Sequence, residues 1–313
     1  MSGRTVNRLA GFFVACVLAM PLQVALDAQP SGPSRIGAAP PSLVRGQGEV
    51  VLTYQLAAPA QTVAIEIASS TGEVVRRWGN GSAEDELERA AGAHQLGWNL
   101  RTGDASIFRA PGDERPTVIP GPVVAPGTYG VRLLIDGRVA ASASIVVRHD
   151  PAGARESDIS AHVAFARQLA LRTTTVTAMV DDLRAAKRDV TARIKNARSP
   201  VIGLAGDVVL RKLTEVEVGL AEPALRVPVA VPAPEKTLSV RLDVLVTENG
   251  ANEQPPSPVA RAALNALDSE IDTQVQRLGS VVTNEIEAFN NLLTNAMMEP
   301  IRVPRVPARA TNK

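Results

Sequence analysis

The chain has 313 residues with 33 basic and 32 acidic side chains, which gives a net charge of +1 at pH 7. This balance excludes the electrostatic surface of a protein that binds nucleic acid or anionic lipid through basic patches. Cys16 is the only cysteine, so the chain has no internal disulfide and depends on packing for stability. The length predicts two domains, each large enough for its own core.

Residues 1–28 have the three-part pattern of a secretory signal. Two arginines precede an apolar run over residues 9–20, and Pro21 and small residues follow it. An uncleaved anchor is the alternative, because the run approaches membrane-spanning length. We expect an exported protein, whether periplasmic, in the cell envelope or secreted, without a membrane span once the signal is removed. Cleavage would remove Arg4, Arg8 and Asp27, leaving 31 basic and 31 acidic side chains.

Residues 29–43 are rich in proline, glycine, serine and alanine and contain few large apolar side chains. Such a segment cannot bury enough surface to offset the entropy lost on ordering. The composition predicts a disordered linker that tethers the folded part of the chain.

Residues 44–150 alternate between apolar and polar side chains with a period of two, which indicates strands with one buried face. The expected strands cover residues 50–56, 63–67, 74–78, 96–100, 129–135 and 139–147. Asp136-Gly137 is a strong hairpin signal, because a two-residue primed turn needs positive φ. Short strands of this kind predict an antiparallel β-sandwich.

From Asp150-Pro151 onward the period changes to that of a helix. Apolar stripes over residues 157–198 and 258–297 predict two long amphipathic helices, the first about 60 Å long, that pack antiparallel. Residues 202–222 have helical spacing. Residues 236–248 are ambiguous between helix and strand, and helix is favoured because a lone strand would have no partner. The prediction is a helical bundle of coiled-coil type over residues 151–301, with a disordered tail over 302–313.

Several segments together resemble the C-terminal region of secreted bacterial proteins built on sortilin-like, Asp-box β-propellers, which are often described as glycosyl hydrolases. The segments are "YQLAAPAQTVAIEIASSTGEVVRRW", "GAHQLGWNLR", "PGPVVAPGTYGVRLLIDG", "RHDP" and "IEAFNNLL". The β part also resembles the Ig-like domain of flagellar hook-capping proteins. The resemblance implies an α+β multidomain protein, with an Ig/fibronectin-like β-sandwich followed by the helices. No active-site residue can be carried over from the family, because its site is expected on the propeller and this sequence contains no Asp-box propeller.

The candidate catalytic and metal-binding residues favour structural roles. Trp98 is in phase with the apolar positions of its strand, so its ring is expected in the core. The three histidines lack the spacing of a zinc site. His162 lies one helical turn after Asp158, which is typical of a surface pair. We therefore expect no catalytic residue, no metal and no cofactor.

Two groups of acidic residues also favour structural roles. The acidic run over residues 84–88 has no calcium-loop spacing and is interpreted as a solvated turn. Glu285 and Glu287 are two positions apart on a helix, so they point in different directions and cannot flank one glycosidic bond.

The segment from Arg101 to Val124 is long for a loop, and long loops often have functional roles. Its residues Phe108, Asp113, Glu114 and Arg115 are the candidate contacts for a protein partner. The alternative is an Ω-loop that only covers the edge of the sandwich.

The sequence thus predicts an exported, non-catalytic interaction or assembly module. It would dock onto a separate propeller protein or associate with itself through exposed stripes on the long helices. One alternative is an accessory or remnant domain of a glycosyl hydrolase or sialidase-like protein, with a carbohydrate-related function. Another is a spacer between envelope layers.

Overall fold

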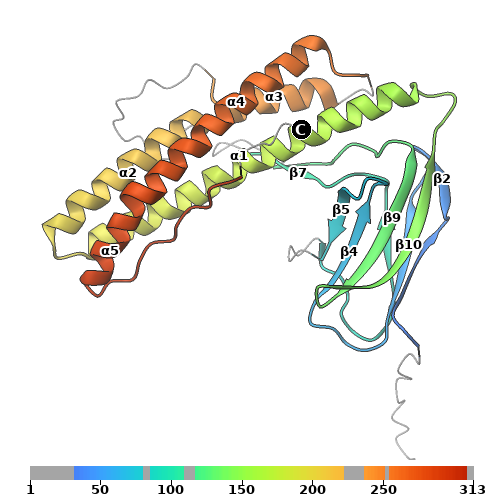
Figure 1. Ribbon diagram of the computed structural model, residues 1–313, viewed down its shortest axis with the longest axis horizontal. Helices are drawn as coiled ribbons and strands as arrows, with labels where there is room; N and C mark the ends of the chain where they lie inside the picture. Colours follow the sequence, from blue (N-terminus) through green and yellow to red (C-terminus); the bar gives the residue numbers. More distant parts are fainter. Residues whose placement is uncertain (1–31, 80–84, 109–116, 222–235, 251–253, 309–313) are drawn as a thin grey trace, which may run out of the picture.

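A computed structural model describes residues 32–79, 85–108, 117–221, 236–250 and 254–308. The structure is mixed α/β, with strands in the first half of the chain and helices in the second (Figure 1). The expected signal over residues 1–28 lies outside the described residues. No helix in the described part of the chain is both long and apolar enough to cross a membrane.

The larger strands form two sheets. One has the order β1-β3-β6, and the other has the order β2-β10-β9-β4-β5, in which β2 pairs parallel to β10 and the other pairs are antiparallel. The strands are β1 (Arg35–Ala39), β2 (Ser42–Val44), β3 (Val50–Leu56), β4 (Val63–Ala68), β5 (Val74–Trp78), β6 (Gly92–Trp98), β9 (Gly127–Ile135) and β10 (Arg138–Arg148). One cluster of buried apolar side chains draws on both sheets and includes Tyr54, Trp98 and Leu133.

The hairpin predicted at Asp136-Gly137 joins β9 to β10. Both residues have positive φ, 48° and 78°, as a primed turn requires. The Asp136 carboxylate also accepts hydrogen bonds from the backbone N–H groups of Gln61 and Thr62, at 3.0 and 2.8 Å. The turn is therefore tied to the segment that leads into β4.

The prediction of a disordered linker over residues 29–43 is wrong for much of its described part, because β1 and β2 lie there. The β1 residues pair with β3 over five positions, and Ser42 to Val44 pair with the end of β10. Composition missed these strands because the pairing is made by backbone groups. These backbone hydrogen bonds pair the short strand β1 with β3 and the short strand β2 with β10.

The helices are α1 (Glu156–Asn196), α2 (Pro200–Leu220), α3 (Leu238–Gly250), α4 (Pro258–Val281) and α5 (Glu287–Asn295). One turn of π-helix, η2 (Val282–Ile286), joins α4 to α5. The ambiguous segment over residues 236–248 belongs to α3, so the favoured helix is confirmed. Its strand-like alternation arises because Leu238 and Leu242 are buried while Val240 and Val244 are exposed on another face.

The two long helices run parallel, so the predicted antiparallel packing is wrong. Arg172, in the first half of α1, donates to Asp268 in the first half of α4 at 2.7 Å. Arg193, near the end of α1, donates to Glu299 just beyond α5 at 2.8 Å. The reason is that α2 follows α1 after a short turn and runs back along it (Figure 1). The chain then begins its second long helix at the starting end of the first.

The expected disordered tail over residues 302–313 is also wrong for its described part. Residues 302–308 have no regular secondary structure, yet they lie against α1 (Figure 1). The backbone N–H groups of Arg302 and Arg305 donate to the carboxylates of Asp189 and Asp182, at 3.4 and 3.2 Å. The two aspartates are two helical turns apart, so they present acceptors along one line of the helix.

Candidate functional site between the strands and the helices

The segment over residues 101–124 docks onto α1. It forms two short strands, β7 (Ala105–Ser106) and β8 (Val118–Ile119), which pair antiparallel. The Ser106 N–H donates to the Thr174 hydroxyl at 3.2 Å, and the Thr177 hydroxyl donates to the Ser106 carbonyl at 3.1 Å. Both threonines belong to α1, so hydrogen bonds attach this segment to the helix.

Phe108 extends this contact. Its ring packs partly buried against the core of the helical region, and the Arg184 guanidinium lies 4.6 Å from the ring centroid. The residue predicted to meet a separate partner is therefore engaged by the chain's own helix. The other three predicted contacts, Asp113, Glu114 and Arg115, lie outside the described residues.

A further contact joins the strands to α1 near its start. The Arg167 guanidinium forms a two-pronged ion pair with the Glu73 carboxylate, with N–O distances of 2.8 and 2.6 Å. Glu73 precedes β5, so this pair and the Phe108 contact hold the two regions of the chain at separate points. Such paired geometry restricts rotation more than a single hydrogen bond does.

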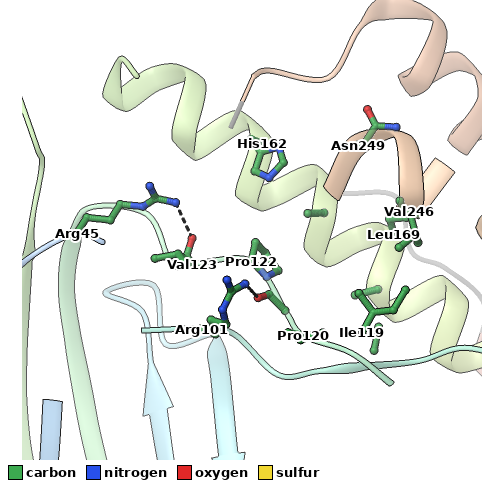
Figure 2. Close-up of a pocket in the computed structure, with 14 residues that line it drawn as sticks. Arg45, Arg101, Ile119, Pro120, Pro122, Val123, His162, Leu169, Val246 and Asn249 are labelled. Atoms are coloured by element: carbon green, nitrogen blue, oxygen red, sulfur yellow. Dashed lines mark hydrogen bonds between the residues drawn. The ribbon is translucent and has the colours of Figure 1, made fainter. Parts of the chain in front are cut away.

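The second half of the same segment forms one wall of a cleft with a cavity volume of about 280 Å³. Ile119 and Pro122 contribute from the segment, Leu169 from α1 and Val246 from α3 (Figure 2). A partly apolar cleft between two regions, with few polar groups, is the usual setting of a small-molecule site. The size is near the lower limit for such sites.

Two arginines line this cleft and also brace its wall (Figure 2). Arg45 donates from Nε to the Val124 carbonyl at 2.8 Å and from Nη2 to the Val123 carbonyl at 3.1 Å. Arg101 donates from Nη1 to the Gly121 carbonyl at 2.8 Å. Backbone carbonyls thus help to hold both guanidinium groups in place.

His162 lines the cleft from α1, and its side chain is buried, with 6% exposed. Its imidazole forms no hydrogen bond with any described residue. The prediction of a surface pair with Asp158 is wrong, because the Asp158 carboxylate instead accepts from Arg155 at 2.9 Å. The helix turns His162 toward the strands, and the sequence spacing alone could not show what lies opposite that face.

The cleft has an uneven charge. Its polar lining side chains in the described chain are Arg45, Arg101, His162 and Asn249, and it includes no aspartate or glutamate. Asn249 donates from Nδ2 to the Leu245 carbonyl at 2.8 Å. The arrangement is therefore suited to an anion beside Arg101, since no carboxylate lines the cleft and the surrounding walls are largely apolar.

The other candidates from the sequence lie elsewhere and are held by local contacts. Trp98 is buried as predicted, and its Nε1 donates to the Arg101 carbonyl at 2.9 Å. Tyr129 meets it edge-on, with ring centroids 5.9 Å apart. His94 and His149 form hydrogen bonds with the carbonyls of Ala90 and Ala154. The described residues contain no group of three or more potential metal ligands.

The acidic candidates contact arginines in the structure. Asp85 and Glu86 pair with Arg76 and Arg89, respectively, as expected for a turn at the surface. Glu84 lies outside the described residues. Arg45, Arg101 and His162 are far apart along the chain and no local motif connects them, so the sequence alone does not group them.

Comparisons with known proteins do not assign the cleft. No protein-family model matches the chain, and no curated protein matches it significantly. Among solved structures, CopC from Methylosinus trichosporium OB3b is 15% identical with a TM-score of 0.21, covering 39% of this chain and 98% of CopC. The alkylpurine DNA glycosylase AlkC of Pseudomonas fluorescens is 18% identical with a TM-score of 0.18, covering 37% of this chain and 31% of AlkC. Scores this low carry no argument about fold or function.

Proposed function

We propose that this chain is an exported, non-catalytic module that assembles with another protein of the bacterial cell envelope. The observation that supports this function is an outward-facing apolar stripe on α2. Val201, Leu204 and Val208 are exposed by 59%, 70% and 37% of their surfaces. They lie at positions i, i+3 and i+7, the spacing with which a helix presents anchors to a groove on a partner.

In this proposal the two sheets form an Ig-like β-sandwich, and the helices form a bundle in which α2 and α3 run against α1 and α4. The shared core of the two sheets supports the first part, and the common core of the helices supports the second. This combination is the one expected from the resemblance to sortilin-like, Asp-box propeller proteins. A separate propeller protein is therefore the proposed partner.

In this proposal the partner binds to α2 and not to the two long helices. The sequence predicts exposed stripes on the two long helices, but many of the apolar positions of α1 and α4 are buried in the helical core, including Val180, Leu183, Leu264 and Leu278. Val201, Leu204 and Val208 of α2 are exposed and can contact another protein. The contacts of Phe108 and Arg167 with the rest of the chain would hold the strands and helices in a fixed arrangement beside it.

Affinity purification from the native envelope tests this function. The triple variant Val201→Ser, Leu204→Ser, Val208→Ser should lose the captured propeller protein, because the apolar anchors are removed. The matched control is Val259→Ser, which changes a single exposed valine, 78% exposed, at the start of α4. Equal capture by the triple variant and the wild type would contradict the proposal.

Light scattering separates this function from self-association. A partner-binding module is expected to remain a monomer in the absence of its partner. A dimer that the triple variant abolishes would instead show that the stripe on α2 joins two copies of the chain.

A further inference from the structure

The strongest unexplained feature is the His162 imidazole. It is buried in the wall of the cleft and has no hydrogen-bond partner among the described residues. Imidazole can donate through one N–H even when neutral. The ring nitrogens of His162 are not among the fully buried polar atoms without a partner, so they reach the space of the cleft and can meet an acceptor on a bound molecule.

Arg101 faces the same cavity from the opposite wall (Figure 2). Its guanidinium carries up to five N–H donors, and it contacts the Gly121 carbonyl through Nη1. No carboxylate in the described ranges forms an ion pair with it. Because the carbonyl contact fixes the guanidinium, little side-chain entropy would be lost when an anion binds.

The apolar side chains of the cleft indicate that the ligand also has an apolar part. Ile119, Pro122, Leu169 and Val246 surround the polar groups with apolar surface. A cavity of about 280 Å³ accommodates a small molecule but not a polymer. An anion with an apolar body fits both the charge and the walls, whereas inorganic phosphate would leave the apolar surface uncovered.

We propose that the cleft between the strands and the helices binds a small organic carboxylate, whose carboxylate accepts hydrogen bonds from Arg101 and His162 and whose apolar body contacts Leu169 and Val246. A carboxylate matches the planar fork of a guanidinium. This site is separate from the partner surface on α2 and does not depend on it. It adds a ligand-binding role to a chain proposed to act by assembly.

Isothermal titration calorimetry on the purified protein tests the site with three probes: phenylacetate, its neutral amide and inorganic phosphate. Phenylacetate should bind, and the amide should bind at least about tenfold more weakly because it lacks the charge. Stronger binding of inorganic phosphate than of phenylacetate would overturn the assignment to a carboxylate. Absence of phenylacetate binding, or equal binding of the amide, would overturn the site.

Two variants test whether phenylacetate binds at Arg101 and His162. Arg101→Gln and His162→Leu should each weaken phenylacetate binding by about tenfold or more. The control Arg138→Gln removes an exposed arginine of the β9–β10 hairpin that does not line the cleft, and it should bind as the wild type does. Unchanged affinity in both cleft variants would overturn the proposal.

Thermal unfolding distinguishes a binding role from a structural one. Arg101→Gln can loosen the wall, because the arginine contacts the Gly121 carbonyl. His162→Leu replaces a buried group without a partner by an apolar one, so the melting temperature without ligand should be unchanged or higher. Weaker binding together with unchanged or higher stability supports a ligand site. A lower melting temperature with wild-type affinity would show that His162 serves only the fold.

Discussion

The Lys187 ammonium donates to the Glu217 carboxylate at 2.7 Å, and both side chains are buried, with 5% and 0% exposed. Arg184 donates from Nε to the other carboxylate oxygen at 2.7 Å. Because Arg184 also lies over the Phe108 ring, this buried cluster connects α2, α1 and the segment that reaches back to the strands. One of the contacts between the two halves of the chain, at Phe108, thus adjoins this buried charge cluster.

Replacing Glu217 should destabilise the protein strongly. Glu217→Gln removes the carboxylate charge to which both Lys187 and Arg184 donate in a largely buried site, and the expected loss is about 3 kcal/mol in the free energy of unfolding. Urea denaturation measures it. The control Glu215→Gln breaks the more exposed pair with Lys212 on the same helix and should cost less than about 1 kcal/mol. Similar losses in the two variants would show that the buried cluster adds nothing specific.

The same cluster predicts a dependence of stability on pH. Burial raises the pKa of Glu217, but the hydrogen bonds from Lys187 and Arg184 outweigh this effect and hold the pKa below its ordinary value of 4.5. A lowered pKa in the folded state means that the stabilisation is fully present above the unfolded value. It is lost as the pH falls through the folded value.

Chemical denaturation of the wild type and Glu217→Gln at a series of pH values measures this dependence. The difference in unfolding free energy between them should be constant near neutral pH and should shrink below about pH 4.5. A difference that does not change with pH would exclude ionised Glu217 as the source of the stabilisation.

Phe108 provides a test of whether the 101–124 segment is structural. Phe108→Ala removes the ring that packs on the helical core beneath Arg184, and the expected loss is about 2 kcal/mol in the free energy of unfolding. The control Val118→Ala changes an exposed residue of the same segment and should have little effect. Unchanged stability combined with loss of a captured partner would restore the interpretation of Phe108 as a partner contact.

Asn290 joins the C-terminal segment to α5. Its Nδ2 donates to the Ile301 carbonyl at 3.3 Å, and its Oδ1 accepts from the Ile301 N–H at 2.8 Å. Asn290→Ala should lower the free energy of unfolding by about 1–2 kcal/mol, because both backbone groups lose their partner. Thermal unfolding compares it with Asn291→Ala, which changes a neighbouring exposed asparagine. An equal effect would indicate that the two hydrogen bonds between Asn290 and Ile301 do not contribute to stability.

The sequence by itself determined the elements whose signals are local. The period of two located the major strands, and the spacing of three and four located α1, α2 and the second long helix, because each period follows from the geometry of a few consecutive residues. The Asp136-Gly137 turn was predictable for the same reason. Trp98 was placed in the core correctly because its phase along β6 is a property of the strand alone.

Only the tertiary structure decided the features that join distant residues. The edge strands β1 and β2 form by backbone pairing, to which their side chains contribute little signal. The parallel direction of α1 and α4 depends on where α2 and α3 return the chain. The cleft brings together Arg45, Arg101, His162 and Asn249. Each of them has an ordinary local setting, and they line one cleft only because residues 101–108 and 117–124 lie beside α1 and α3.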